Sequence, residues 1–374
     1  MAINKEQNKL NVPHLRFPEF QGEWEKCKLG DIAEFSTARV SSAKLDCKNY
    51  VSTENMLQDF QGVVEAKSVP NETNVISFTC GDILISNIRP YLKKVWKATF
   101  DGGCSSDVFV LQATDTVAKD YLHYTVANDK FINYVMSGAK GVKMPRGDKN
   151  QMRTYQLSLP SIQEQHKITK LLTLLDERIA TQSKLIEKLE SLIKGLAHHC
   201  IRDFTNDCEY IRLGDISKIT TGKLDANAQV ENGQYPFFTC AERPFNIDSY
   251  AFDTEALLIS GNGANLGYIN YYKGKFNAYQ RTYVLDHFSV NIQYVKWALK
   301  VLLPQRIAIE KSSSNTPYIV LSTLADLKIP VPNNSKQNHI ANLMMSFEKK
   351  LSNQLALSDL YNKQKQYMLR QMFI

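Results

Sequence analysis

The residues of this chain that could do chemistry are cations and amides rather than catalytic acids, bases or nucleophiles. One cluster, residues 89–97, reads Arg-Pro-Tyr-Leu-Lys-Lys-Val-Trp-Lys and mixes four cations with two aromatic side chains. A second cluster, residues 140–149, reads Lys-Gly-Val-Lys-Met-Pro-Arg-Gly-Asp-Lys, and its glycine and proline predict a loop. Clusters of this kind can contact DNA phosphates, which supply much of the affinity in DNA binding. Either one alone could equally be a solvated strand end or loop.

The second half of the chain offers amides where the first half offers cations. Residues 260–267 read Ser-Gly-Asn-Gly-Ala-Asn-Leu-Gly, which resembles a nucleotide-binding loop but lacks the third glycine at the dinucleotide spacing. The matching stretch of the first half, residues 86–90, has no glycine at all. We therefore interpret the segment as a tight turn with exposed amides. Asn side chains suit the reading of adenine in a major groove, so Asn262 and Asn265 are candidate base readers.

Signatures of catalysis and of metal binding are weak. The sequence has no Asn- or Asp-Pro-Pro-aromatic tetrapeptide of the amino-methyltransferase kind, and no Gly-x-x-x-x-Gly-Lys phosphate loop. Seven cysteines without a Cys-x-x-Cys pair argue against a disulfide framework or zinc site and favour a reducing cytoplasm. His198, His199, Cys200 and Cys208 could suggest a metal, but they lie where a helix ends and a new domain begins. We expect no catalytic residue and no metal site.

The elements that must position these residues occur twice. Matching segments follow one another in the same order, with almost unrelated sequence between them: Leu29–Ile32 with Leu213–Ile216, Ile83–Ser86 with Leu257–Ser260, Val108–Leu111 with Thr282–Leu285, and Leu157–Pro160 with Ile329–Pro332. Gln165 and Gln337 follow the last of these segments. Repeats of this length lie outside the short-period solenoid class, so we infer a duplication of whole domains.

The duplication aligns two loops of different chemistry. Pro145 and Pro317 both stand fifteen residues before the prolines that lead into the helices, Pro160 and Pro332. The loop at Pro145 is cationic, whereas the loop at Pro317 is rich in hydroxyls and amides, as expected if equivalent surfaces read different bases. The predicted DNA-reading side chains are Arg89, Lys93, Lys143 and Arg146 in the first half, and Asn262, Asn265, Arg281, Ser314, Asn315 and Tyr318 in the second.

Each half is followed by a segment with a heptad rhythm. The seam positions alternate steps of four and three residues: Leu172, Leu175, Ile179, Gln182, Ile186, Leu189, Ile193 and Leu196, then Ile340, Met344, Phe347, Leu351, Gln354, Ser358, Tyr361, Lys365 and Met368. This pattern predicts a left-handed coiled coil. We expect helices 163–200 and 335–370 to lie antiparallel, because each starts beside its own domain and ends beside the other, with weaker packing after Leu351. The alternative is that each helix packs on its own domain only.

Capping signals mark the entrances to both helices. Ser161 is a plausible N-cap, and Glu164 stands at the capping-box spacing behind it. At the equivalent place Asn333, Asn334 or Ser335 could cap the second helix.

The fold class that follows is α+β in each half. Short strands at 81–86 and 256–260 alternate irregularly with helices at 120–126 and 291–299. We expect two similar domains separated by two long antiparallel helices, with pseudo-two-fold internal duplication. The predicted parts are a tail at 1–20, a first domain at 21–160, a helical spacer at 161–203, a second domain at 204–332 and a second helical spacer at 333–374.

Bulk composition fits a soluble two-domain protein. At 374 residues each half can bury its own core. The net charge is +7, yet residues 14–160 carry 18 basic and 17 acidic groups and residues 204–332 carry 12 of each. Overall charge therefore gives no argument for nucleic acid; only the local clusters do. No apolar run approaches a membrane span and no signal-peptide core stands at the N-terminus, so we expect a cytoplasmic protein without a membrane partner.

Together these frames resemble the specificity subunit of a bacterial type I restriction-modification system. The resemblance rests on the duplicated Leu-Gly-Asp-Ile entry, the buried strand that ends in serine, and the proline-to-glutamine lead into a long helix. The phrase Leu15–Phe20 followed by Trp24 is also typical of such chains. The resemblance covers residues 14–370, and no single motif in it is decisive.

The resemblance implies two target-recognition domains, each of which reads half of a split DNA sequence, separated by helical regions. Expected partners are double-stranded DNA, two methyltransferase (modification) subunits and restriction subunits with translocase and nuclease activity. S-adenosylmethionine, ATP and Mg2+ are expected on those subunits, and no cofactor or catalytic residue on this chain. Two other classes stay open: a single-chain DNA methyltransferase or endonuclease, and a coiled-coil scaffold for proteins only. Missing catalytic signatures count against the first; salt-dependent binding to duplex DNA would exclude the second.

Overall fold

The computed structural model describes residues 10–203, 208–311 and 318–374. The chain divides into two units, of which unit 1 combines Met1–Thr181 with Ser358–Ile374 and unit 2 is Gln182–Leu357. Each unit therefore contains one repeat and parts of both long helices, α5 (Ile162–His198) and α9 (Asn334–Met372).

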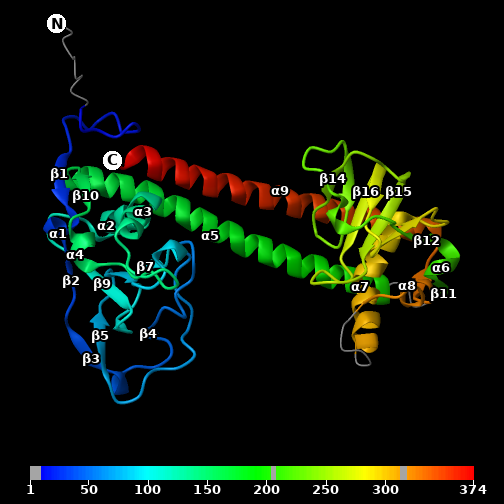
Figure 1. Ribbon diagram of the computed structural model, residues 1–374, viewed down its shortest axis with the longest axis horizontal. Helices are drawn as coiled ribbons and strands as arrows, with labels where there is room; N and C mark the ends of the chain where they lie inside the picture. The colour runs from blue at the N-terminus through cyan, green and yellow to red at the C-terminus, as the bar shows by residue number, and fades with distance from the viewer. Residues whose placement is uncertain (1–9, 204–207, 312–317) are drawn as a thin grey trace, which may run out of the picture. The chain divides into compact units, whose positions relative to one another are not determined.

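Unit 1 is built from small sheets covered by short helices (Figure 1). One sheet is antiparallel, with the spatial order β2 (Ala33–Phe35), β9 (Val108–Ala113), β6 (Ile83–Ser86) and β7 (Val95–Lys97). Another has the order β3 (Arg39–Ser41), β5 (Asn74–Phe78), β8 (Gly102–Cys104) and β4 (Tyr50–Val51). The antiparallel pair β1 (Glu25–Lys28) and β10 (Gln156–Leu159) stands apart. The helices are α1 (Leu29–Ile32), η1 (Ser42–Lys44), η2 (Pro90–Leu92), α2 (Lys119–Val126), α3 (Asp129–Ser137) and α4 (Lys149–Arg153).

Unit 2 repeats this plan with one larger sheet. Its six strands have the order β12 (Lys218–Thr221), β17 (Thr282–Asp286), β15 (Phe252–Ser260), β16 (Ile269–Ala278), β13 (Tyr235–Phe238) and β14 (Phe245–Ile247). A separate antiparallel pair consists of β11 (Glu209–Arg212) and β18 (Lys328–Val331). The helices are the π-helical turn η3 (His199–Asp203), α6 (Leu213–Ile216), η4 (Ala226–Ala228), α7 (Ile292–Lys311) and α8 (Leu321–Ala325).

The duplicated sequence segments form the same elements with the same pairing. Strand β6 pairs with β9 so that Ser86 faces Val108, and β15 pairs with β17 so that Ser260 faces Thr282. All four residues of β6 are buried, which explains why its sequence is a continuous apolar run rather than an alternating one. The α+β class and the internal duplication are thus confirmed.

The predicted ends of two helical segments are wrong. Helix α7 continues to Lys311 instead of ending at residue 299, because Val301 and Leu303 beyond that point are also buried in the core. The loop predicted at 140–149 gives way to α4 at its last residue, since Asp148 accepts hydrogen bonds from the amides of Asn150 and Gln151 and so caps a helix.

The start of each long helix is tied to its own domain by an equivalent glutamine. Gln165 accepts the amide of Ala118 at 2.8 Å and donates to the carbonyl of Pro160 at 3.0 Å. Gln337 accepts the amide of Asn291 at 2.9 Å and donates to the carbonyl of Pro332 at 2.7 Å. Both glutamines are buried, so each satisfies backbone groups that water cannot reach.

The capping predictions are half right. The Ser161 hydroxyl accepts the amide of Glu164 at 3.4 Å, and Asn333 accepts the amide of Lys336 at 3.0 Å. The Glu164 carboxylate does not complete a capping box. It is 1% exposed and receives two bonds of 2.8 Å from the Arg16 guanidinium and one of 3.2 Å from the Trp24 indole. A two-pronged bond from arginine satisfies a buried carboxylate better than a single backbone amide can.

The long helices run antiparallel, as predicted from each helix starting beside its own domain and ending beside the other. In unit 1 the first half of α5 faces the second half of α9, where Asp176 lies 2.6 Å from Lys365. In unit 2 the second half of α5 faces the first half of α9, where the Gln182 amide donates to the carbonyl and side-chain oxygens of Gln354 at 3.0 and 2.7 Å. The seam residues of α9 from Phe347 onward are only half-buried.

Each helix end completes a core. Met372 and Phe373, at the end of α9, are buried in the unit 1 core, where Phe373 stacks on Tyr121 at 5.1 Å. Cys200 and Ile201, just beyond α5, are buried in the unit 2 core. Phe373 follows Gln337 by as many residues as Ile201 follows Gln165, so the two buried helix ends are equivalent. Within the described residues no helix is both long and apolar enough to cross a membrane.

Candidate nucleic-acid interface

The structure joins the two basic clusters of unit 1, which lie far apart in the sequence. The amide of Arg89 donates to the carbonyl of Pro145 at 2.8 Å, and Ile88 forms an antiparallel bridge with Arg146. The amide of Gly147 donates to the carbonyl of Asn87 at 3.0 Å. The turn after β6 and the loop before α4 are therefore one continuous surface.

The turn after β6 has an unusual backbone. Arg89 and Lys93 adopt left-handed conformations, with φ of 50° and 53°, on either side of the short helix η2. Such conformations cost an L-residue roughly 1–2 kcal/mol relative to glycine. The surrounding hydrogen bonds hold both residues there, since the amide of Leu92 donates to Arg89 and that of Lys93 donates to Pro90.

Unit 2 has the same backbone arrangement with different residues. Gly263 and Gly267 take the left-handed conformation at the positions of Arg89 and Lys93, with φ of 79° and 81°. The amide of Gly261 donates to the carbonyl of Arg281 at 2.8 Å, and the amide of Ile319 donates to the carbonyl of Gly261 at 2.9 Å. In unit 1 the equivalent bonds run from Asn87 to Asp107 at 2.8 Å and from Gly147 to Asn87.

We name this shared arrangement the common frame. It comprises residues 87–93, 107 and 146–147 in unit 1, and residues 261–267, 281 and 318–319 in unit 2. The predicted tight turn at 260–267 is confirmed as part of it.

Two side-chain positions of the common frame differ in chemistry between the units. Unit 1 has Asp107 and Arg146, whose carboxylate and guanidinium lie 3.4 Å apart. Unit 2 has Arg281 and Tyr318 at the same two places, and both side chains are exposed. One backbone thus presents an acid and a cation in one unit and a cation and a phenol in the other.

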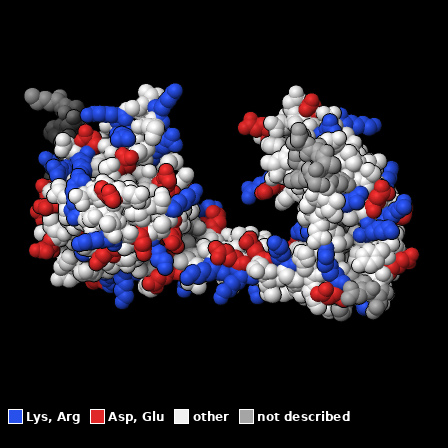
Figure 2. All heavy atoms as spheres, turned by 90° about the horizontal axis from the view of Figure 1, so that it is seen from below, with Lys and Arg blue, Asp and Glu red and all other residues white. Residues whose placement is uncertain are grey.

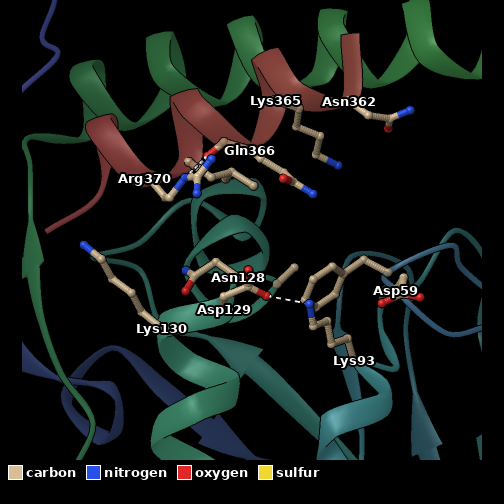
Figure 3. Close-up of a pocket in the computed structure, with 12 residues that line it drawn as sticks. Asp59, Lys93, Asn128, Asp129, Lys130, Asn362, Lys365, Gln366 and Arg370 are labelled. Carbon is tan, nitrogen blue, oxygen red and sulfur yellow. Dashed lines mark hydrogen bonds and ion pairs between the residues drawn. The ribbon is translucent and has the colours of Figure 1, made fainter. Parts of the chain in front are cut away.

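The structure separates the predicted residues of unit 1 into two groups. Arg89, Lys143 and Arg146 are exposed on the joined surface. Lys93 is half-buried and forms an ion pair of 2.8 Å with Asp129 at the start of α3. Its side chain lines a pocket of about 240 Å³ between α3 and the second half of α9, where Lys365, Gln366 and Arg370 also point (Figure 3).

The predicted residues of unit 2 are likewise divided. Asn262 and Asn265 are half-buried, and the Asn265 amide donates to the carbonyl of Cys240 at 3.0 Å. That bond holds the segment after β13 against the turn, so Asn265 has a structural task. Arg281 and Tyr318 are exposed, whereas Ser314 and Asn315 lie outside the described residues.

Two further cations of the clusters are packed inward. The Lys94 ammonium donates to the carbonyl of Thr53 at 2.6 Å, and burial together with Arg89 lowers its pKa. The Lys149 ammonium lies 4.7 Å from the ring centroid of Phe109, and burial together with Arg153 lowers its pKa as well. Figure 2 shows cations and acids interspersed over the visible faces, so local position rather than a broad field distinguishes this surface.

Asp107 is a half-buried, charged member of the common frame that the sequence analysis did not select. It stands directly before Val108–Leu111, just as Arg281 stands directly before Thr282–Leu285. Arg281 is a predicted reader, so the internal alignment of the two halves also indicates Asp107.

The residues considered as metal ligands have other surroundings. Cys200 is buried in the unit 2 core, while the His199 ring lies 3.0 Å from the carboxylate of Asp203. In the described part of the chain, no group of three or more His, Cys, Asp or Glu side chains is placed to hold a metal ion.

Comparisons with known proteins agree with the duplication. Residues 21–191 and 205–357 each match the family model of the type I restriction modification DNA specificity domain. The type I restriction enzyme EcoDI specificity subunit of Escherichia coli is 44% identical over 135 residues, which is 36% of this chain and only 30% of that protein. A putative type I specificity subunit of Mycoplasma pneumoniae is 24% identical over 336 residues, 82% of this chain and 84% of that protein.

A solved structure shows the same fold over nearly the whole length. The crystal structure of a type I restriction-modification system S subunit from M. genitalium matches 97% of this chain and 99% of its own, with a TM-score of 0.66 at 17% identity.

Proposed function

The chain belongs to the type I restriction-modification DNA specificity family, and we propose that it reads a bipartite DNA sequence, one half with each repeat. The observation that carries this proposal is the common frame. Two units hold the same backbone hydrogen bonds and left-handed turns, yet present different side chains at equivalent positions. Different half-targets read by one type of surface require this combination.

The proposed division of the chain follows its strands and helices. Residues 21–160 and 204–332 are the two target-recognition domains, 161–203 and 333–374 the helical spacers, and 1–20 an N-terminal tail. The strand pairs β1–β10 and β11–β18 support these borders, because each closes its domain directly before a long helix begins.

The chain has no turnover of its own in this proposal. Two methyltransferase subunits attach along the helices and supply S-adenosylmethionine and the pocket for a flipped adenine. Restriction subunits join this assembly in the bacterial cytoplasm and use ATP and Mg2+. The repeated, antiparallel helices support two attachments of the same kind, since each presents an equivalent sequence of elements to a partner.

The proposed DNA-reading residues are those predicted from the sequence of both halves, and their tasks differ with their exposure. Arg89, Lys143 and Arg146 contact DNA from unit 1, and Asn262, Arg281 and Tyr318 from unit 2, together with Ser314 and Asn315. Lys93 and Asn265 act at the edge of the surface, because their ion pair with Asp129 and bond to Cys240 restrict them.

Methylation mapping tests the proposal most directly. The host genome is sequenced for modified bases with the gene present and with it deleted. A bipartite motif that is methylated only when the gene is present is the expected result. Unchanged methylation in a host that expresses the neighbouring methyltransferase would contradict it.

Experiments on the purified chain separate the other classes. We expect its affinity for duplex DNA to fall steeply with salt, as phosphate contacts release counterions. Salt-independent or absent binding would favour a protein scaffold. Methyl transfer by the isolated chain with S-adenosylmethionine would favour a single-chain enzyme.

A further inference from the structure

We infer that Asp107 is a specificity-determining residue, which positions the Arg146 guanidinium to read a G·C base pair in the half-target of unit 1. This inference rests on the proposed function and adds to it a positioning residue and the base pair that is read. Three features of the structure carry it: a fixed backbone at both residues, the contact between their side chains, and the absence of a structural need for the acid.

The backbone of Asp107 cannot shift. Its carbonyl accepts the amide of Asn87 at 2.8 Å, and the strand that begins at Val108 is buried along its first four residues. Only the side chain, about one-third exposed, is left to vary. The carboxylate therefore stands at a defined point on the edge of the sheet.

The backbone of Arg146 is held just as firmly. Its amide donates to the carbonyl of Lys140 at 2.9 Å, and the amide of Lys140 returns a bond of 3.1 Å. From that anchor the guanidinium reaches to 3.4 Å from the Asp107 carboxylate while its side chain stays 55% exposed. An arginine held at its outer end loses less rotamer freedom on binding than a free one, which favours affinity and geometric selectivity.

Stability is a weak explanation for this pair. Ion pairs at such exposure contribute little to folding, because water screens them and ordering two side chains costs entropy. Unit 2 keeps the same frame bonds with Arg281 in place of the acid, so the frame does not require a carboxylate. An acid on a DNA-facing surface also repels phosphates, which makes it costly unless it serves recognition.

The chemistry of the pair suits a G·C base pair. Arginine donates two bonds to the O6 and N7 atoms of guanine, and a carboxylate beside the guanidinium orients it for both bonds. An A·T pair would leave the arginine facing an amino donor and a methyl group instead. The two side chains together thus discriminate more sharply than arginine alone.

The test compares Asp107→Asn with Asp115→Asn in the full chain, purified with the methyltransferase subunits encoded beside it. Asp115 is also exposed on unit 1 but lies outside the common frame, so both changes remove one negative charge. The probes are a duplex with the methylation-mapped target, its single-base variants, and an unrelated duplex of the same length. Dissociation constants for all of them are measured at one salt concentration.

We expect Asp107→Asn to weaken binding to the target about tenfold, while binding to the unrelated duplex stays equal or tightens. The same variant should show a smaller preference for guanine at one position of the unit 1 half-target. Asp107→Glu should restore part of the preference, and Asp115→Asn should change neither. An undiminished ratio of target to unrelated binding in Asp107→Asn would overturn the inference.

The Arg146→Ala background shows whether Asp107 acts through the arginine. There Asp107→Asn should have no further effect on base preference, because nothing remains to be positioned. An equal loss in both backgrounds would overturn the positioning role. A wild-type complex that fails to prefer the mapped target would instead overturn the proposed function, so the two failures are distinguishable.

Discussion

Two left-handed residues of the common frame in unit 1, Arg89 and Lys93, are retained at a cost in stability. Arg89 and Lys93 occupy conformations that unit 2 fills with Gly263 and Gly267. Since glycine takes the same left-handed conformations in unit 2, the turn alone does not demand a cation at either place. Strained non-glycine residues tend to persist where the side chain has a task.

Replacing Arg89 with glycine should raise stability and lower DNA affinity at once. Relief of the left-handed conformation, less the added entropy of the unfolded chain, should stabilise the fold by about 0.5–1 kcal/mol. Loss of the cation should weaken binding to target and unrelated duplexes alike if Arg89 contacts phosphate. Urea unfolding and DNA titration measure the two effects.

Lys143→Gly is the matched control for that change. Lys143 is exposed in the same surface but its φ is not positive, so glycine there should weaken binding without stabilising the fold. A loss of stability in Arg89→Gly would show that the guanidinium holds the loop together.

His123 should make unit 1 sensitive to acid. Its side chain is half-buried in α2 with the ring Nδ1 enclosed, and desolvation, reinforced by Lys365 and Lys97 against the opposing Asp176 and Asp120, lowers the pKa of the ring to about 4. The unfolded chain takes up a proton near pH 6.5 whereas the folded chain does not, so stability falls as pH drops from 6.5 toward 4.

The expected loss between pH 7 and pH 5 is roughly 2 kcal/mol. Urea unfolding of the wild type and of His123→Leu at pH 7 and pH 5 measures this loss. The free energy of unfolding of the variant should depend less on pH, because it lacks the contribution of this histidine. An identical pH dependence in both proteins would contradict a neutral ring in the folded chain.

Part of the candidate site could be predicted from residue types alone. Cations on a turn and on a glycine-rich loop indicated Arg89 and Arg146, and the structure places both on one exposed surface. The partners of Lys93 and Asn265 could not be predicted, because Asp129 and Cys240 approach them only through the packing of distant segments. Local sequence predicts which side chains are exposed better than it predicts their ion-pair and hydrogen-bond partners.

At the level of elements, the heptads carried more information than the caps. Their seam predicted that the two helices pair, because apolar periodicity persists whatever the neighbouring elements are. Glu164 shows the opposite case: its spacing signalled a capping box, but the burial of Arg16 and Trp24 around it offered stronger partners. A cap competes with tertiary contacts, and those are invisible in a local pattern.

The contact between Gln182 and Gln354 should couple the two residues strongly. Gln182 is buried, and its amide has both oxygens of Gln354 as acceptors. Replacing Gln182 alone with leucine removes that donor and leaves the side chain of Gln354 beside an apolar one, which should cost about 1–3 kcal/mol.

Replacing both glutamines with leucine should recover that loss or exceed the wild-type stability, since an apolar seam needs no polar partners. Chemical denaturation of both single variants and the double variant completes the cycle. Additive losses would mean that the two residues stabilise the helices independently of one another.

Across the whole molecule, the duplication predicted which parts exist but not what completes them. The repeated segments defined two domains and two helices from order alone. That the end of α9 enters the unit 1 core, as the end of α5 enters the unit 2 core, required the structure. Phe373 gave no signal, because it lies off the heptad seam that runs through Lys365 and Met368.

Phe373→Ala should therefore destabilise unit 1 selectively. The ring is 5% exposed, stacks on Tyr121, and its backbone carbonyl accepts a bond of 2.8 Å from Lys130. Truncation of a buried phenylalanine costs about 3–5 kcal/mol through lost burial and the cavity left behind. Hydrogen exchange resolved along the chain should show faster exchange in β6 and β9 and unchanged exchange in β15 and β17.

Tyr367→Ala on the same helix is the control, because that side chain is 56% exposed. It should leave exchange in both units unchanged, as loss of an exposed ring opens no cavity. If Phe373 completes the core of unit 1 and unit 1 reads one half of the target, Phe373→Ala should also reduce the sequence preference in only that half of the methylated motif. Equal relaxation of both halves, or faster exchange in both sheets, would mean that the helix end supports the chain as a whole rather than the core into which it packs.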